Sequence, residues 1–126
     1  MLDPLLIDVA LVLDMSTSME RETGRGRPKH AAAVEAALAF VDLLDLRGGD
    51  GSAGDRVAVI GFNNEAWVEI DLGADRPAIA SALGRLSARI TEGTRLDLAV
   101  VTGARAVLGP RHRTDHRPVI ILLTDG

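Results

Sequence analysis

The sequence predicts an α/β domain of the doubly wound type, with a mostly parallel sheet, one antiparallel edge strand and helices on both faces. Short, almost continuous apolar runs alternate with segments of helical periodicity, which is typical of a parallel sheet covered on both sides. In one segment, apolar and polar residues instead alternate just after a tight turn, which indicates a hairpin. A length of 126 residues favours a single domain.

The first half of the chain is predicted to form a strand, a helix and a second strand. Residues 5–13 form a nearly unbroken apolar run, as expected of a buried parallel strand. After a polar loop, Pro28 is predicted to stand in the first turn of a helix that ends before residues 47–52. The apolar positions of this helix are Val34, Ala37, Leu38, Val41 and Leu44. Residues 56–62 form the second buried strand.

The second half is predicted to add a hairpin strand, two helices and a last strand. Residues 66–72 alternate after the 63–65 turn, and Asp75 caps a helix with Pro77 in its first turn. The apolar positions of this helix are Ile79, Leu83, Leu86 and Ile90. A third helix precedes the 118–123 strand, and its predicted buried side chains are Leu96, Val100, Ala104, Val107 and Leu108.

Composition excludes several classes of function. With 47% hydrophobic residues the chain is not disordered, and its apolar runs are shorter than the roughly 20 residues of a membrane helix. The net charge of −4 and the 2% aromatic content argue against a nucleic-acid partner. The absence of cysteine excludes disulfides and thiolate chemistry. Asp3 and Asp8 do not fit a secretory leader, so a cytoplasmic location is the expectation.

Acidic side chains follow two of the predicted strands. Asp14 ends the first strand, with the hydroxyls of Ser16 and Ser18 close behind it, and Asp125 follows the last strand. Ligands of doubly wound sheets bind outside the carboxyl ends of strands, and oxygen donors suit a hard cation such as Mg²⁺. The alternative is structural: Asp14 and Ser16 only cap a turn, and Asp125 belongs to a β-turn.

Residues 9–19 closely resemble the opening of a von Willebrand factor A domain. The hallmark of that family, Asp-x-Ser-x-Ser, is present as Asp14, Ser16 and Ser18. A Thr in a Gly-Thr loop before a helix is matched by Thr94, and an Asp after the fourth strand is matched by Asp125. The motifs occur in the family's order over the whole chain, and together they form the family's metal-ion-dependent adhesion site.

The resemblance implies a role for each position. Ser16 and Ser18 would bind Mg²⁺, or alternatively Mn²⁺ or Ca²⁺, directly, and Thr94 would bind it directly or through water. Asp14 and Asp125 would act mostly through bound waters. Because hydroxyl ligands leave the charge of the ion poorly neutralised, an open position attracts an Asp or Glu carboxylate of a partner protein. The implied function is metal-dependent protein–protein interaction, without catalysis or membrane insertion.

Two features depart from the family pattern or lie outside the motifs. Residues 20–27 form a longer, charged loop beside the predicted metal, which either helps to select the partner or is a solvated insertion. His112 and His116 stand four apart beside Asp115, too few ligands for zinc, and we expect an exposed basic loop over residues 111–117.

Two other functional classes remain open. One is a metal-dependent hydrolase with Asp14 or Ser16 as nucleophile, although neither metal loop offers a His or Lys as general base. The other is a structural interaction module that uses no metal. Measuring Mg²⁺ or Mn²⁺ binding and phosphoester hydrolysis distinguishes these classes.

The resemblance is to a bacterial domain, and the last predicted strand leads to the expectation that residues 1–126 are its N-terminal two-thirds. Residues 118–123 are apolar on both faces, and an uncovered edge strand of this kind invites pairing with another chain. We therefore expect a further parallel strand beside it, with covering helices, or self-association of the fragment through this edge.

Overall fold

The computed structural model describes residues 6–46, 54–110 and 113–125. Its first elements are β1 (Leu6–Asp14), the 3₁₀ helix η1 (Thr17–Glu20), α1 (Lys29–Val41), β2 (Arg56–Phe62) and β3 (Ala66–Gly73). The later ones are α2 (Arg76–Arg85), the 3₁₀ helix η3 (Leu86–Arg89), α3 (Leu96–Leu108) and β4 (His116–Leu123). The loop predicted at residues 47–52, the strand residue Leu5 and His112 lie outside the described ranges.

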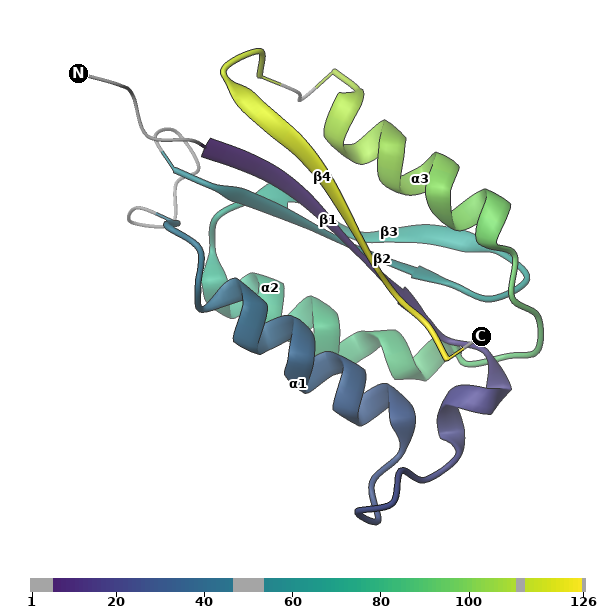
Figure 1. Ribbon diagram of the computed structural model, residues 1–126. Coiled ribbons are helices and arrows are strands. Elements are labelled where there is room, and N and C mark those ends of the chain that lie inside the picture. Colours follow the sequence, from purple (N-terminus) through teal and green to yellow (C-terminus); the bar gives the residue numbers. More distant parts are fainter. Residues whose placement is uncertain (1–5, 47–53, 111–112, 126) are drawn as a thin grey trace.

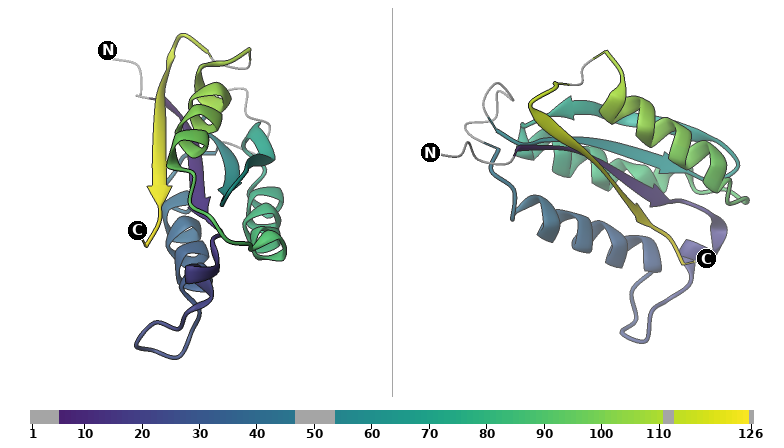
Figure 2. Two further views of the ribbon diagram at one scale, coloured as in Figure 1. Left: turned by 90° about the vertical axis from the view of Figure 1, so that its right-hand side faces the viewer. Right: turned by 45° about the horizontal axis from the view of Figure 1, so that its top comes forward.

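The described strands form one sheet in the order β3-β2-β1-β4. β1 pairs in parallel with both β2 and β4, and β3 is antiparallel to β2. α1 and α2 cover one face of the sheet and α3 covers the other (Figures 1 and 2). The predicted fold class, a mostly parallel doubly wound sheet with one antiparallel edge strand, is therefore confirmed.

The sheet has a packed layer on each face because successive side chains of a strand point to opposite sides. Val9, Leu11 and Leu13 belong to the layer beneath α1 and α2, whereas Ala10 and Val12 belong to the layer beneath α3. All five are fully buried. Burial on both faces explains why β1 shows no alternation of apolar and polar residues.

α1 and α2 have the predicted buried faces but are shorter than predicted, because α1 ends at Val41, before Leu44, and Leu86 already belongs to η3. The predicted apolar positions of both helices are buried or packed against the core layer on that face. Asp75 caps α2, because its side chain accepts a hydrogen bond of 3.2 Å from the amide of Ala78. Pro28 departs from the prediction slightly: it precedes α1 in an extended conformation, and the helix begins at Lys29.

The predicted buried face of α3 is wrong at three positions. Leu96, Val100 and Leu108 are 39%, 49% and 59% exposed. The residues that face the sheet are mostly small: Ala99, Gly103, Ala106 and Val107. A Cβ at Gly103 would lie 3.2 Å from Cγ2 of Val12, so the helix backbone approaches β1 closely only because residue 103 has no side chain. Small residues therefore set the packing face, and the larger apolar residues point outward.

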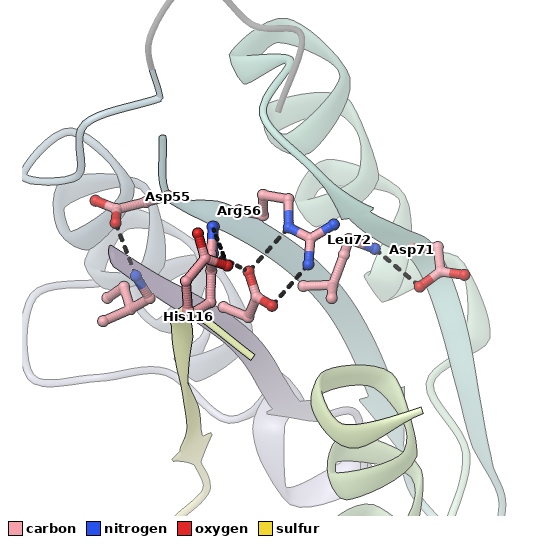
Figure 3. Close-up of polar contacts among 8 residues, drawn as sticks. Asp55, Arg56, Asp71, Leu72 and His116 are labelled. Carbon is pink, nitrogen blue, oxygen red and sulfur yellow. Dashed lines mark hydrogen bonds and ion pairs between the residues drawn. The ribbon is translucent and has the colours of Figure 1, made fainter. Parts of the chain in front are cut away.

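A buried ionic cluster joins three strands at the end of the sheet opposite to Asp14. Arg56 on β2 donates to both carboxylate oxygens of Asp8 on β1, at 2.9 and 2.7 Å, and Nδ1 of His116 on β4 lies 2.8 Å from Oδ1 of Asp8 (Figure 3). The expectation of an exposed basic loop is wrong at His116, which begins β4 with a fully buried side chain. The buried Asp8 carboxylate attracts this ring into the sheet.

β4 is an edge of the sheet within the described ranges, where it pairs with β1. Its residues Ile120 and Leu122, on the α3 side, are each 37% exposed. The further strand expected beside residues 118–123 stays a prediction. None of the helices in the described part of the chain has the length and apolar character needed to cross a membrane.

Candidate metal site

The parallel strands bring the sequence motifs to one edge of the sheet. Asp14 is the last residue of β1, and Asp125 follows the end of β4 by two residues. Because β1 and β4 are parallel neighbours, their carboxyl ends lie together, and Figure 1 shows the C-terminal end of the chain beside the turn that follows β1. Residues that are more than 100 positions apart in sequence thus meet at one place.

A chain of hydrogen bonds connects the hydroxyls to one carboxylate. The hydroxyl oxygens of Ser16 and Ser18 are 3.0 Å apart, and the Ser18 hydroxyl donates to Oδ1 of Asp125 at 3.0 Å. Ser16 is buried and Ser18 is partly buried. Three of the five predicted site residues are therefore in direct contact in a row of oxygen atoms.

Asp14 is fully buried and organises the loops around this row. Its Oδ1 accepts a 2.8 Å hydrogen bond from the amide of Ser16, and its Oδ2 accepts one of 2.7 Å from the hydroxyl of Thr124. The carboxylate thus fixes the loop after β1 and the end of β4 to each other. Hydrogen bonds to both oxygens also provide the polar partners that a buried carboxylate requires.

Thr94 lies at the same end of the sheet, in the loop that precedes α3. The amide of Arg95 donates to the carbonyl of Asn63 at 2.7 Å, and the amide of Thr91 donates to the carbonyl of Met15 at 3.2 Å. These bonds hold the loop against the segments that follow β1 and β2. Among the described residues no hydrogen bond links the Thr94 side chain to the other four predicted site residues, so its place as a ligand stays a prediction.

Lys29 is a cation in contact with the site that the motifs did not indicate. Its ammonium donates to Oδ2 of Asp125 at 3.1 Å, which leaves Oδ1 of the same carboxylate to Ser18. The hydrogen bond from Lys29 is the largest influence on the pKa of Asp125 and lowers it; burial opposes the shift and the Ser18 bond adds to it. The carboxylate is therefore ionised at neutral pH.

The oxygen donors fit a hard divalent cation. The five predicted residues supply three hydroxyls and two carboxylates and no nitrogen or sulfur, which is the donor chemistry that Mg²⁺ and Ca²⁺ prefer. Residues 6–46, 54–110 and 113–125 contain no group of three or more His, Cys, Asp or Glu side chains suited to a metal. A metal here would therefore depend on the Ser and Thr hydroxyls for much of its coordination.

Asn63 is a structural residue of the site that sequence analysis assigned only to a turn. Its side-chain amide, which is buried, donates to the carbonyl of Arg89 at 2.8 Å and to that of Met15 at 3.4 Å. Its Oδ1 accepts from the amide of Glu65 at 3.2 Å. One side chain therefore braces the segments that carry the Ser16 and Thr94 loops. Its position directly after β2, at the same sheet edge as Asp14, was the available sequence signal.

Replacing Asn63 by alanine is expected to lower the free energy of unfolding by about 1–3 kcal/mol, because buried carbonyl groups lose their donor. Urea denaturation followed by circular dichroism measures this change. Asn64→Ala is the matched control, since Asn64 is exposed and keeps its Cβ, which lies 2.7 Å from the place that a Cβ at residue 93 would take. An equal effect of the two substitutions would contradict the bracing role of Asn63.

Comparison with known proteins identifies the family and the fold. The model of the von Willebrand factor type A domain family matches residues 9–126. No curated protein matches the chain in sequence. Among solved structures, the von Willebrand factor domain of the type V pili tip protein Mfa5 from Porphyromonas gingivalis is similar over 97% of this chain and 38% of its own, with 23% identity and a TM-score of 0.78.

Two further structures resemble the chain. BatB from Bacteroides thetaiotaomicron is similar over 92% of this chain and 52% of its own, with 22% identity and a TM-score of 0.74. Proximal thread matrix protein 1 from the mussel byssus, solved with a zinc-occupied metal-ion-dependent adhesion site, is similar over 97% of this chain and 29% of its own, with 24% identity and a TM-score of 0.75. The chain thus spans about half or less of each of these structures.

Proposed function

The chain belongs to the von Willebrand factor type A domain family, and from this premise we propose that it is a divalent-metal-dependent protein–protein interaction module. The family is known for protein–protein interaction. The proposed site consists of Asp14, Ser16, Ser18, Thr94 and Asp125, with Mg²⁺ as the proposed metal and Mn²⁺ or Ca²⁺ as alternatives. The observation that carries the proposal is the row of oxygens from Ser16 through Ser18 to Asp125.

Each residue would have a defined task when the metal is bound. Ser16 and Ser18 would offer their hydroxyl oxygens, and Asp14 would keep the Ser16 loop and Thr124 in position. Neutral hydroxyl ligands leave much of the ion's charge unbalanced, so the metal would supply an attraction for an Asp or Glu carboxylate of the partner. This chemistry is recognition and not bond cleavage, and the similarity to a pilus tip protein and a byssus matrix protein supports a binding role.

The proposal predicts that partner binding requires both the metal and a carboxylate. Peptides selected from a display library on the Mg²⁺-loaded protein are expected to contain an Asp or Glu whose change to Asn or Gln weakens binding by at least about tenfold. Excess EDTA should have the same effect. Fluorescence anisotropy of labelled peptides measures both. Selected peptides that bind equally well in EDTA would contradict the adhesion mechanism.

A second candidate is an interaction module that uses no metal. The contact between Lys29 and Asp125 favours it, because an ammonium already compensates the charge of that carboxylate. Isothermal titration with Mg²⁺ and Mn²⁺ decides between the two candidates. Binding with one-to-one stoichiometry supports the metal-dependent module, and the absence of binding at millimolar metal supports the other.

A further inference from the structure

Lys29 reaches Asp125 across 96 positions of sequence because of the hairpin that precedes α1. Residues Glu22 and Pro28 form an antiparallel bridge, and the amide of Thr23 donates to the carbonyl of Arg27 at 2.7 Å. Gly26 closes the turn with a φ of 76°, a conformation that favours glycine. The charged loop of residues 20–27 is therefore an ordered hairpin.

The hairpin fixes the first residue of α1 next to the site. The amide of Lys29 donates to the carbonyl of Arg21 at 2.8 Å, and Arg21 directly follows η1, which carries Ser18. The Lys29 side chain is only 36% exposed and that of Asp125 only 20%, so the pair is partly shielded from water. Lys29 is also the only lysine of the sequence, all other strongly basic residues being arginine.

The two carboxylates of the site have different partners. Both oxygens of Asp14 accept from neutral groups, the Ser16 amide and the Thr124 hydroxyl. Asp125 accepts from Ser18 and from the Lys29 ammonium. The Lys29 ammonium therefore contacts Oδ2 of Asp125, whereas Ser18 donates to Oδ1 of the same carboxylate. An ammonium is a compact, mobile charge that an incoming ion can displace more easily than a bidentate guanidinium.

We infer that Lys29 is the resident counter-ion of the metal-free site and that a divalent cation must compete with it for Asp125. The inference rests on the proposed function, since it concerns the regulation of the same site. A second positive charge a few ångströms from a bound metal repels it, and the metal also has to break the Lys29–Asp125 contact. Lys29 thus stabilises the metal-free protein and raises the metal concentration at which the site fills.

The test compares the full chain with a Lys29→Met variant, which keeps an unbranched side chain of nearly the same length and removes its charge. Isothermal titration at constant pH and ionic strength is expected to show about tenfold tighter binding of Mg²⁺ or Mn²⁺ by the variant. In EDTA the variant should melt about 2 °C lower than the native protein, because Asp125 has lost its cation. Saturating metal should remove or reverse this difference.

Two controls make these results specific. Arg25→Met removes one positive charge from the same hairpin, and Arg25 is exposed, so metal affinity should change far less than in Lys29→Met. In an Asp125→Asn background, Lys29→Met should no longer change the melting temperature in EDTA. The coupling between the two substitutions measures the contact itself.

The outcomes separate this inference from the proposed function. Metal binding by the native protein that is equal to or tighter than binding by Lys29→Met would overturn the role of Lys29 and leave the metal site intact. Absence of metal binding by both proteins would overturn the proposed function and the inference together. Binding by Lys29→Met alone would support the inference in its strongest form.

Discussion

Replacing Asp14 by alanine is expected to lower the affinity for Mg²⁺ and Mn²⁺ by about 100-fold or more, to the point where titration calorimetry at millimolar metal detects no binding. The carboxylate is fully buried and holds both the Ser16 amide and the Thr124 hydroxyl. Its loss removes one of the two negative charges of the site. It also releases the loop that positions the hydroxyls of Ser16 and Ser18.

The same substitution is expected to reduce stability without unfolding the sheet. Two donors lose their acceptor, which costs about 1–3 kcal/mol in free energy of unfolding. Circular dichroism should therefore still show the native helices and strands. Asp115→Ala is the control for removal of a carboxylate, because its side chain is 74% exposed at the opposite end of β4. Unchanged metal affinity in Asp14→Ala would refute the assignment of the site.

The strands and the sheet edge that carries the site could be predicted from sequence for a simple physical reason. β1 and β2 are buried on both faces, so nearly every residue has to be apolar, and the run stops where the chain leaves the sheet. Polar residues such as Asp14 and Asn63 then appear at the carboxyl ends of parallel strands. The family motif added the specific expectation that Ser16 and Ser18 provide hydroxyls.

Features that depend on packing partners could not be predicted in this way. The orientation of α3 follows from the close approach of Gly103 to Val12, which is a tertiary contact, whereas periodicity alone favoured the larger residues. The place of Lys29 at Asp125 depends on the geometry of the hairpin of residues 20–27. Spacing in sequence gives no information about either contact.

Asp8 shows the same limit for a buried charge. In sequence it is a single acidic interruption of an apolar run, without an indication of its partners. Parallel pairing then places Arg56 directly opposite Asp8 on β2, while His116 lies near it on β4. Burial tends to raise the pKa of Asp8, but the hydrogen bonds and charges of Arg56 and His116 together lower it below its usual value.

Replacing Asp8 by alanine is expected to reduce the free energy of unfolding by about 3–5 kcal/mol, because the buried Arg56 guanidinium would lose both of its hydrogen bonds to the Asp8 carboxylate. A loss of this size is a large part of the stability of an ordinary domain. Urea denaturation at pH 7 measures it. Asp8→Asn, which keeps the shape of the side chain, separates the loss of charge from the loss of volume.

A second Arg–Asp pair in the chain provides a control of the same geometry. Arg95 donates to Asp97 at 2.9 and 2.7 Å, the same distances as in the Arg56–Asp8 pair, but both side chains are more than half exposed. Asp97→Ala is therefore expected to change stability little, since exposed ion pairs are screened by water. Similar losses in Asp8→Ala and Asp97→Ala would contradict the importance of burial.

Acid should remove the difference between the native protein and Asp8→Ala. The pKa of Asp8 is lowered in the folded protein relative to the ordinary carboxyl value of about 3.9, so its contribution to stability is fully present above that value. The contribution is lost as the pH falls through the lowered pKa of the folded protein. The unfolded chain binds the proton more readily than the folded protein does, so acid favours unfolding. Urea midpoints of the two proteins should therefore differ most above about pH 5 and converge below pH 4. A difference that stays constant down to pH 3 would show that lost packing, and not the charge of Asp8, accounts for the destabilisation.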